Sequence, residues 1–154
     1  GFGRNPGEGI IENYILNQSN AKNPNICFIP TATGDNEAYK NNYYATFTKL
    51  NCNPVHLDFF KRTPDLENLI NEQDVIFVGG GNTKSMLAVW KDWGLDLILH
   101  EAYKNGVVMS GVSAGPLIQT SHEMFRDAVV FAEPTIEGCR CQVSMNVDET
   151  GDKA

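Results

Sequence analysis

The 154-residue sequence has no apolar run near the roughly 18 residues of a membrane-spanning helix, and no charged-then-apolar signal pattern at its start. Basic residues are also few, since 12 Lys and Arg stand against 19 Asp and Glu, for a formal net charge of −7. Nucleic acids and anionic membranes bind basic surfaces, so neither is an expected partner. Together these absences predict a cytoplasmic protein.

The four cysteines form neither a disulfide framework nor an evident metal site. Cys27 lies in the apolar run NICFIP, where a small buried thiol is expected, and Cys52 lies in a turn-like stretch. Cys139 and Cys141 form a single C-x-C with no second cysteine pair or histidine pair nearby, whereas a structural zinc site needs four ligands. We therefore expect no metal and no cofactor.

Continuous apolar runs, typical of buried strands, alternate with helical stripes along the chain. The runs are NICFIP (25–30), PVHLDFF (54–60), DVIFVGGG (74–81) and VVMSG (107–111), and DAVVFAE (127–133) is a weaker fifth candidate. Buried strands separated by amphipathic helices predict a mostly parallel, doubly wound sheet in a three-layer α/β/α arrangement. We expect one α/β domain over residues 1–154, with a polar tail.

Two of the expected helices have marked boundaries. Thr63, Pro64 and Asp65 offer a cap, a proline for the first helical position and an acidic first turn. Gly94 is expected to divide a later helical region, whose apolar stripe consists of Met86, Trp90, Trp93 and Leu97.

Three of the predicted strands are followed by loops of unusual composition: PTATGD (30–35), GGGNT (79–83) and GVSAG (111–115). Ligands of open parallel sheets bind at the carboxyl ends of the strands, so these loops should share one functional edge.

GVSAG fits the G-x-S-x-G nucleophile elbow, with the strand before it that this motif requires. The elbow would hold Ser113 above the sheet, and the backbone amide of Ala114 would face a developing oxyanion. The alternative is a tight strand-to-helix turn in which the serine only caps the helix.

The glycines of GGGNT would let backbone amides approach a ligand closely. An oxyanion hole completed by Gly80 or Gly81 is one interpretation, and a plain loop with Asn82 as helix cap is the other. The lysine ending of a phosphate loop is absent at the required spacing. GFGRNPGEG at the start of the chain misses the dinucleotide fingerprint, because Pro6 stands at the third glycine position.

A serine nucleophile needs a general base within hydrogen-bond reach, and the chain has three histidines. His56 lies in a predicted strand and His100 near the end of a helix, where structural or solvated roles are expected. His122 follows the elbow by nine residues and is a weak candidate, with a surface position as the alternative. The third member of a triad stays open among Glu123, Asp127 and Glu133.

With GGGNT and GVSAG in place, the chain resembles the dipeptidase E and cyanophycinase family of serine peptidases, whose fold is shared with class I glutamine amidotransferase domains. The likeness covers about residues 1–116 and leaves 117–154 divergent. It implies that Ser113 is the nucleophile and that small peptides, typically aspartyl ones, are cleaved without a metal. The implied oxyanion hole consists of the Gly80, Gly81 and Ala114 amides, with Asn82 beside the pocket.

The chain also departs from this family. Family members extend further and carry the catalytic histidine in a later segment, whereas no histidine here follows His122. A shortened member is therefore expected. It is either a serine peptidase acting through an acyl-enzyme on Ser113 or an inactive domain that binds a small acidic ligand or a partner. An unpaired edge in a shortened sheet further predicts homodimer formation.

Overall fold

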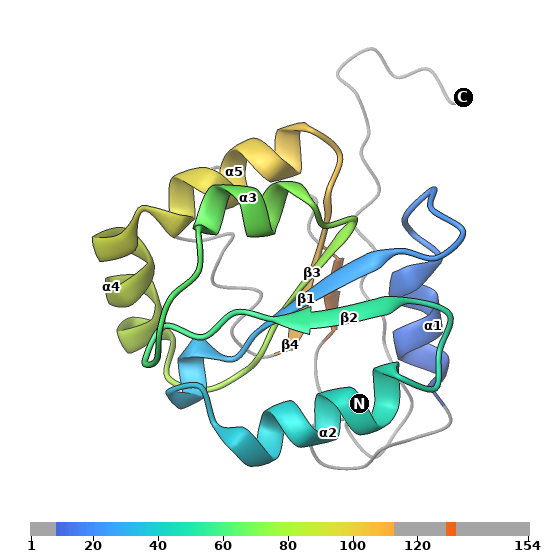
Figure 1. Cartoon of the computed structure of the whole chain (residues 1–154), viewed down its shortest axis with the longest axis horizontal. Coiled ribbons are helices and arrows are strands. Elements are labelled where there is room, and N and C mark those ends of the chain that lie inside the picture. The colour runs from blue at the N-terminus through green and yellow to red at the C-terminus, as the bar shows by residue number, and fades with distance from the viewer. Residues whose placement is uncertain (1–8, 113–128, 132–154) are drawn as a thin grey trace.

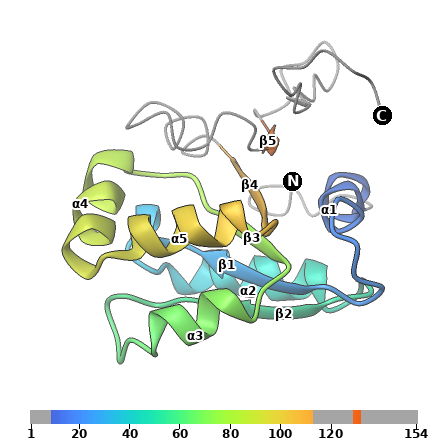
Figure 2. The same ribbon diagram turned by 90° about the horizontal axis from the view of Figure 1, so that it is seen from above.

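A computed structural model describes residues 9–112 and 129–131 of the chain (Figure 1). Its strands form one sheet in the order β2-β1-β3-β4-β5, and every neighbouring pair is parallel. Figure 2 shows the strands following one another in this order. The strands are β1 (Asn25–Ile29), β2 (Asn53–His56), β3 (Val75–Val78), β4 (Val108–Val112) and β5 (Val129–Phe131).

Helices cover both faces of this sheet, with α3 and α5 on one side and α2 on the other (Figure 1). The first layer comprises α3 (Leu66–Asn71), α4 (Thr83–Trp93) and α5 (Leu95–Lys104), and the second comprises α1 (Ile10–Leu16) and α2 (Glu37–Phe47). Strand β1 serves both layers: Cys27 and Ile29 pack in the cluster of the first layer, and Ile26 and Phe28 in that of the second. This alternation explains the continuous apolar run, and the predicted three-layer α/β/α fold is confirmed.

Strand β2 is shorter than the run PVHLDFF predicts, because it ends at His56. The Leu57 amide still donates to the Phe28 carbonyl at 2.9 Å, but the next amides turn away from the sheet. A single carboxylate oxygen, Oδ2 of Asp35, accepts from the Phe59 amide at 2.5 Å and the Phe60 amide at 2.8 Å. These two bonds take the place of strand pairing after His56. Leu57 and Phe59 are still buried, which is why the apolar pattern extends beyond the end of the strand.

Helix α3 begins two residues later than predicted. Asp65, rather than Thr63, is the N-cap, and its Oδ1 accepts from the Asn68 amide at 3.1 Å. Pro64 therefore precedes the helix. A carboxylate is a strong capping acceptor, and this explains the shift.

Gly94 divides α4 from α5 as predicted, in a left-handed conformation with φ 71°. The turn at Gly94 changes the direction of the chain, so the apolar stripe of α4 does not continue on the same face of α5. Met86 and Trp90 are buried, but Trp93 and Leu97 are 48% and 65% exposed, so this part of the predicted stripe is wrong. Leu95 and Leu99 supply the buried face of α5 instead. Among the described helices, none is long and apolar enough to cross a membrane.

Candidate active site

The glycine loop after β3 is held against the loop after β1. The Gly79 amide donates to the Ile29 carbonyl at 3.0 Å, and the Asn82 amide donates to the Ala32 carbonyl at 2.7 Å. Ala32 belongs to the short 3-10 helix η1 (Thr31–Thr33). Two of the three loops expected to share one edge of the sheet are therefore in contact.

Gly81 makes the closest approach in this contact. Its φ is 148°, and a Cβ built on it would lie 2.4 Å from the Ala32 carbonyl oxygen. Any larger residue would meet both an unfavourable backbone conformation and a fixed backbone atom. Glycine at this position is what allows the loop to pack on η1.

The amides of Gly80 and Gly81 differ from those on either side. Neither has an acceptor among the described residues, whereas the flanking amides of Gly79 and Asn82 are both bonded. Gly80 is half-buried and Gly81 is exposed. Backbone donors without protein acceptors, close to a strand end, are the groups that can bind an oxyanion or another small acceptor.

Asn82 caps the helix that follows, as its sequence position predicts. Its Oδ1 accepts from the Ser85 amide at 3.0 Å, and α4 begins at Thr83. Trp90, further along α4, donates from Nε1 to Oγ1 of Thr31 at 3.2 Å in a buried contact. The glycine loop is therefore fixed at its start by β1 and at its end by η1 and α4.

Strand β4 ends at Val112, so it includes Gly111 and Val112 of the predicted elbow and stops directly before Ser113. Val78 pairs with Gly111 in the register of β3 and β4, so the glycine loop starts beside the last residues of β4. The other serine of this region, Ser110, is buried and donates to the Ile76 carbonyl at 2.8 Å, which gives it a structural role. Ser113, Ala114 and His122 lie outside the described residues, as do the triad candidates Glu123, Asp127 and Glu133.

The two described histidines lie away from the elbow. His56 pairs with Phe28, Phe28 with Phe77, and Phe77 with Ser110, so three strand spacings, about 14 Å, separate His56 from β4. His100 lies on α5, one turn before the connection that leads to the start of β4, which is the opposite edge of the sheet. Both fit the structural roles expected from the sequence.

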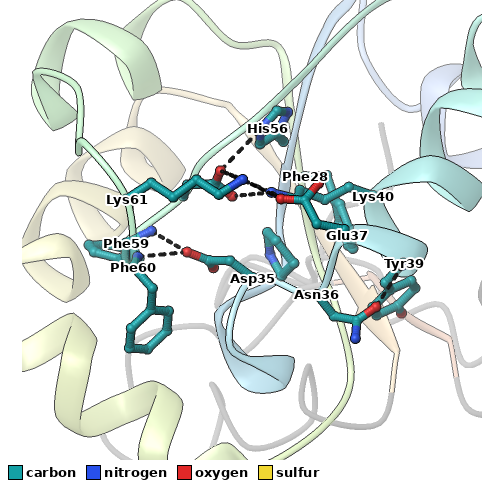
Figure 3. A network of polar contacts seen from close by, with 12 residues as sticks. Phe28, Asp35, Asn36, Glu37, Tyr39, Lys40, His56, Phe59, Phe60 and Lys61 are labelled. Atoms are coloured by element: carbon teal, nitrogen blue, oxygen red, sulfur yellow. Dashed lines mark hydrogen bonds and ion pairs between the residues drawn. The ribbon is translucent and has the colours of Figure 1, made fainter.

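A polar network at the carboxyl end of β2 was not predicted from the sequence (Figure 3). Lys40, whose side chain is 4% exposed, donates from Nζ to both carboxylate oxygens of Asp58, at 2.8 and 2.9 Å, and to Glu37 at 3.1 Å. Burial alone would lower the pKa of Lys40, but the hydrogen bonds to the two carboxylates outweigh it and the pKa is raised. Lys61 also binds Glu37.

His56 belongs to this same network. Its Nδ1 lies 2.6 Å from the Tyr44 hydroxyl, and its Nε2 lies 3.5 Å from Oδ2 of Asp58. Within the described part of the chain, no group of three or more His, Cys, Asp or Glu side chains is arranged to hold a metal ion. The network therefore joins α2 to the loop after β2 through hydrogen bonds and ion pairs. In the sequence, His56 and Asp58 lie within the apolar run PVHLDFF, which predicts a buried strand and gives no indication of a polar network.

Cys27 is fully buried, and burial raises the pKa of its thiol far above the ordinary value. This side chain acts as a small apolar group of the core, as predicted.

Comparisons with known proteins agree with this architecture. The model of peptidase family S51 matches residues 1–138. The chain is 51% identical over 118 residues to YgaJ, an uncharacterized peptidase of Bacillus subtilis (strain 168), and the match covers 76% of this chain and 51% of YgaJ. A crystal structure of a candidate peptidase E protein from Listeria monocytogenes EGD-e matches with a TM-score of 0.57 and 25% identity, over 70% of this chain and 55% of the other.

The chain thus spans about half the length of the relatives that it matches. The family match, in contrast, takes in nearly all of it, including the glycine loop and the predicted elbow. This chain belongs to peptidase family S51.

Proposed function

We propose that the chain is a serine peptidase of the dipeptidase E type, in which Ser113 is the nucleophile. The observation that carries the proposal is the pair of Gly80 and Gly81 amides. They have no acceptor among the described residues and lie beside the end of the strand that leads to Ser113. Membership of a peptidase family supports the same chemistry.

In this mechanism, Oγ of Ser113 attacks the carbonyl carbon of the scissile peptide bond while a general base takes its proton. The negative charge that develops on the carbonyl oxygen is stabilised by the amides of Gly80, Gly81 and Ala114. The C–N bond then breaks, the amine leaves with a proton from the base, and water hydrolyses the acyl-enzyme. His122 is the candidate base within this sequence, and small aspartyl peptides are the proposed substrates.

The proposal is tested with a fluorophosphonate probe and with aspartyl dipeptides. We expect the probe to label Ser113 in the unmodified chain, and the label to disappear in Ser113→Ala. Ser85→Ala is the matched control, because Ser85 is exposed on α4 and its hydroxyl has no part in the mechanism. Absence of labelling at Ser113 in folded protein would overturn the proposal.

A second candidate function is a catalytically inactive domain that binds a small acidic ligand through the same amides. It is favoured by the positions of His56 and His100, neither of which lies near the carboxyl end of β4. Calorimetric titration with aspartate separates the two functions. Binding by a chain that the fluorophosphonate does not label supports the inactive domain, whereas labelling of Ser113 rejects it.

A further inference from the structure

Thr31 places a hydroxyl inside the apolar cluster that joins η1 to α4. Thr31 is 3% exposed and Trp90 is 2% exposed, and the indole Nε1 of Trp90 donates to Oγ1 of Thr31 at 3.2 Å. The cluster around this bond is apolar and includes Ala32, Val78 and Met86. Apolar contacts have no preferred direction, whereas a buried hydrogen bond does. The bond therefore restrains the orientation of α4 against η1.

The same 3-10 helix also holds the glycine loop. The Ala32 carbonyl, next to Thr31, accepts from the Asn82 amide at 2.7 Å, and Gly81 packs closely on the same oxygen. Helix η1 is thus bonded to the start of α4 and, through the indole, to a residue about 12 Å further along the helix axis. The first attachment alone would leave α4 free to tilt about its start, and the second restrains that tilt.

The two proposed oxyanion-hole donors lie between fixed points of this arrangement. The Gly79 amide is bonded to β1 and the Asn82 amide to η1, whereas the Gly80 and Gly81 amides have no acceptor among the described residues. The direction of these two N–H groups therefore depends on how η1 and α4 are held. Such donors stabilise an oxyanion only when they point at the position where its charge develops.

We infer that Thr31 is a positioning residue, whose bond to Trp90 sets the direction of the two oxyanion-hole amides of the glycine loop. The inference rests on the proposed serine peptidase function and assigns a further residue to it. Thr31 acts on the reaction only through the glycine loop. Its contribution is therefore to stabilisation of the transition state rather than to substrate binding, which is a contribution to kcat rather than to KM.

A substitution that removes only the acceptor tests the inference. Thr31→Val keeps the branched shape and leaves the buried indole N–H without its partner. We expect kcat for an aspartyl dipeptide to fall about tenfold or more, with KM within about twofold of the original. Thr31→Ser keeps an acceptor oxygen and should retain kcat within about threefold. Rates are expressed per Ser113 labelled by the fluorophosphonate, so an unfolded fraction cancels.

Tyr43→Phe is the matched control, because it also removes a buried hydroxyl that makes a hydrogen bond. Tyr43 donates to the Ile26 carbonyl at 2.9 Å in the apolar cluster of the α2 layer, so its loss should lower stability in urea denaturation and leave kcat per labelled site unchanged.

Trp90→Phe supplies an independent variant, since it removes the donor of the same bond. Two substitutions that break one shared bond are not additive. In a Trp90→Phe chain, Thr31→Val should therefore lower kcat no further.

The outcomes separate this inference from the proposed function. An unchanged kcat in Thr31→Val, with the unmodified chain active, overturns the inference and leaves the function standing. An equal fall in Tyr43→Phe also overturns it, because a general loss of stability would then be the cause. Multiplied losses in the double variant overturn it as well, because the bond to Trp90 would then not be the cause. An unmodified chain that is neither labelled nor active overturns both.

Discussion

The contact between Gly81 and η1 predicts a large loss of stability in Gly81→Ala. A new Cβ would lie 2.4 Å from the Ala32 carbonyl oxygen, where ordinary contact begins at 3.4 Å. The carbonyl has little freedom to move, because it also accepts from the Asn82 amide at 2.7 Å. The positive φ costs an alanine about 1–2 kcal/mol and overpacking costs about 1–3 kcal/mol, so we expect a total of about 3 kcal/mol.

Urea denaturation followed by tryptophan fluorescence measures this loss, since Trp90 is buried next to η1. Gly34→Ala is the control: Gly34 has a φ of 65°, and a Cβ added there would meet nothing within 4 Å, so only the backbone cost of about 1–2 kcal/mol applies. The difference between the two variants isolates the steric contact. Equal losses in both variants would refute the reasoning, because the Ala32 carbonyl would then contribute nothing.

Two further predictions concern the carboxylates near the end of β2. Asp35→Ala leaves the buried Phe59 amide without its acceptor and should cost about 2–3 kcal/mol in urea denaturation, whereas Asp35→Asn keeps an acceptor oxygen and should cost less; equal losses would contradict this. For Glu37, hydrogen bonds first from Lys61 and then from Lys40 lower the pKa from 4.5 to about 2. Because the pKa of Glu37 is lower in the folded chain than in the unfolded chain, the ionised carboxylate stabilises the fold at pH values above the unfolded-state pKa of 4.5. The difference in stability between the unmodified chain and Glu37→Gln should therefore be full above pH 4.5 and vanish as the pH falls towards 2. Because Glu37 is exposed, added salt should shrink that difference, and a difference that persists at pH 2 would count against the ion pairs.

The sheet could be predicted from the sequence because its strands are buried on both faces. In β1 and β3, successive side chains point alternately to the two helical layers and are buried in both. The apolar run is therefore not interrupted by polar residues. The break at Gly94 and the cap at Asn82 were equally visible, since each depends on the local chemistry of one residue. These signals need no knowledge of distant contacts.

Features that depend on distant contacts were missed. Asp35 and Lys40 look like ordinary surface residues in the sequence, yet Asp35 binds the Phe59 and Phe60 amides and Lys40 is buried against Asp58. Such partners come from other elements, so spacing along the chain does not reveal them. For the site, glycine content predicted a loop that approaches a ligand, but the contact of Gly81 with Ala32 emerged only from the fold.

The bond between the Asn82 amide and the Ala32 carbonyl has a consequence for the kinetics of folding. It joins two loops that are separated along the chain by α2, β2, α3 and β3. Bringing the two ends of so long a segment together costs chain entropy before this bond can form. The pairing of the parallel strands β1 and β3 has the same entropic cost. The glycine loop therefore takes its final shape only after β1 and β3 have paired. In a nascent or partly folded chain, the Gly80 and Gly81 amides would therefore lack the arrangement that they have in the folded chain.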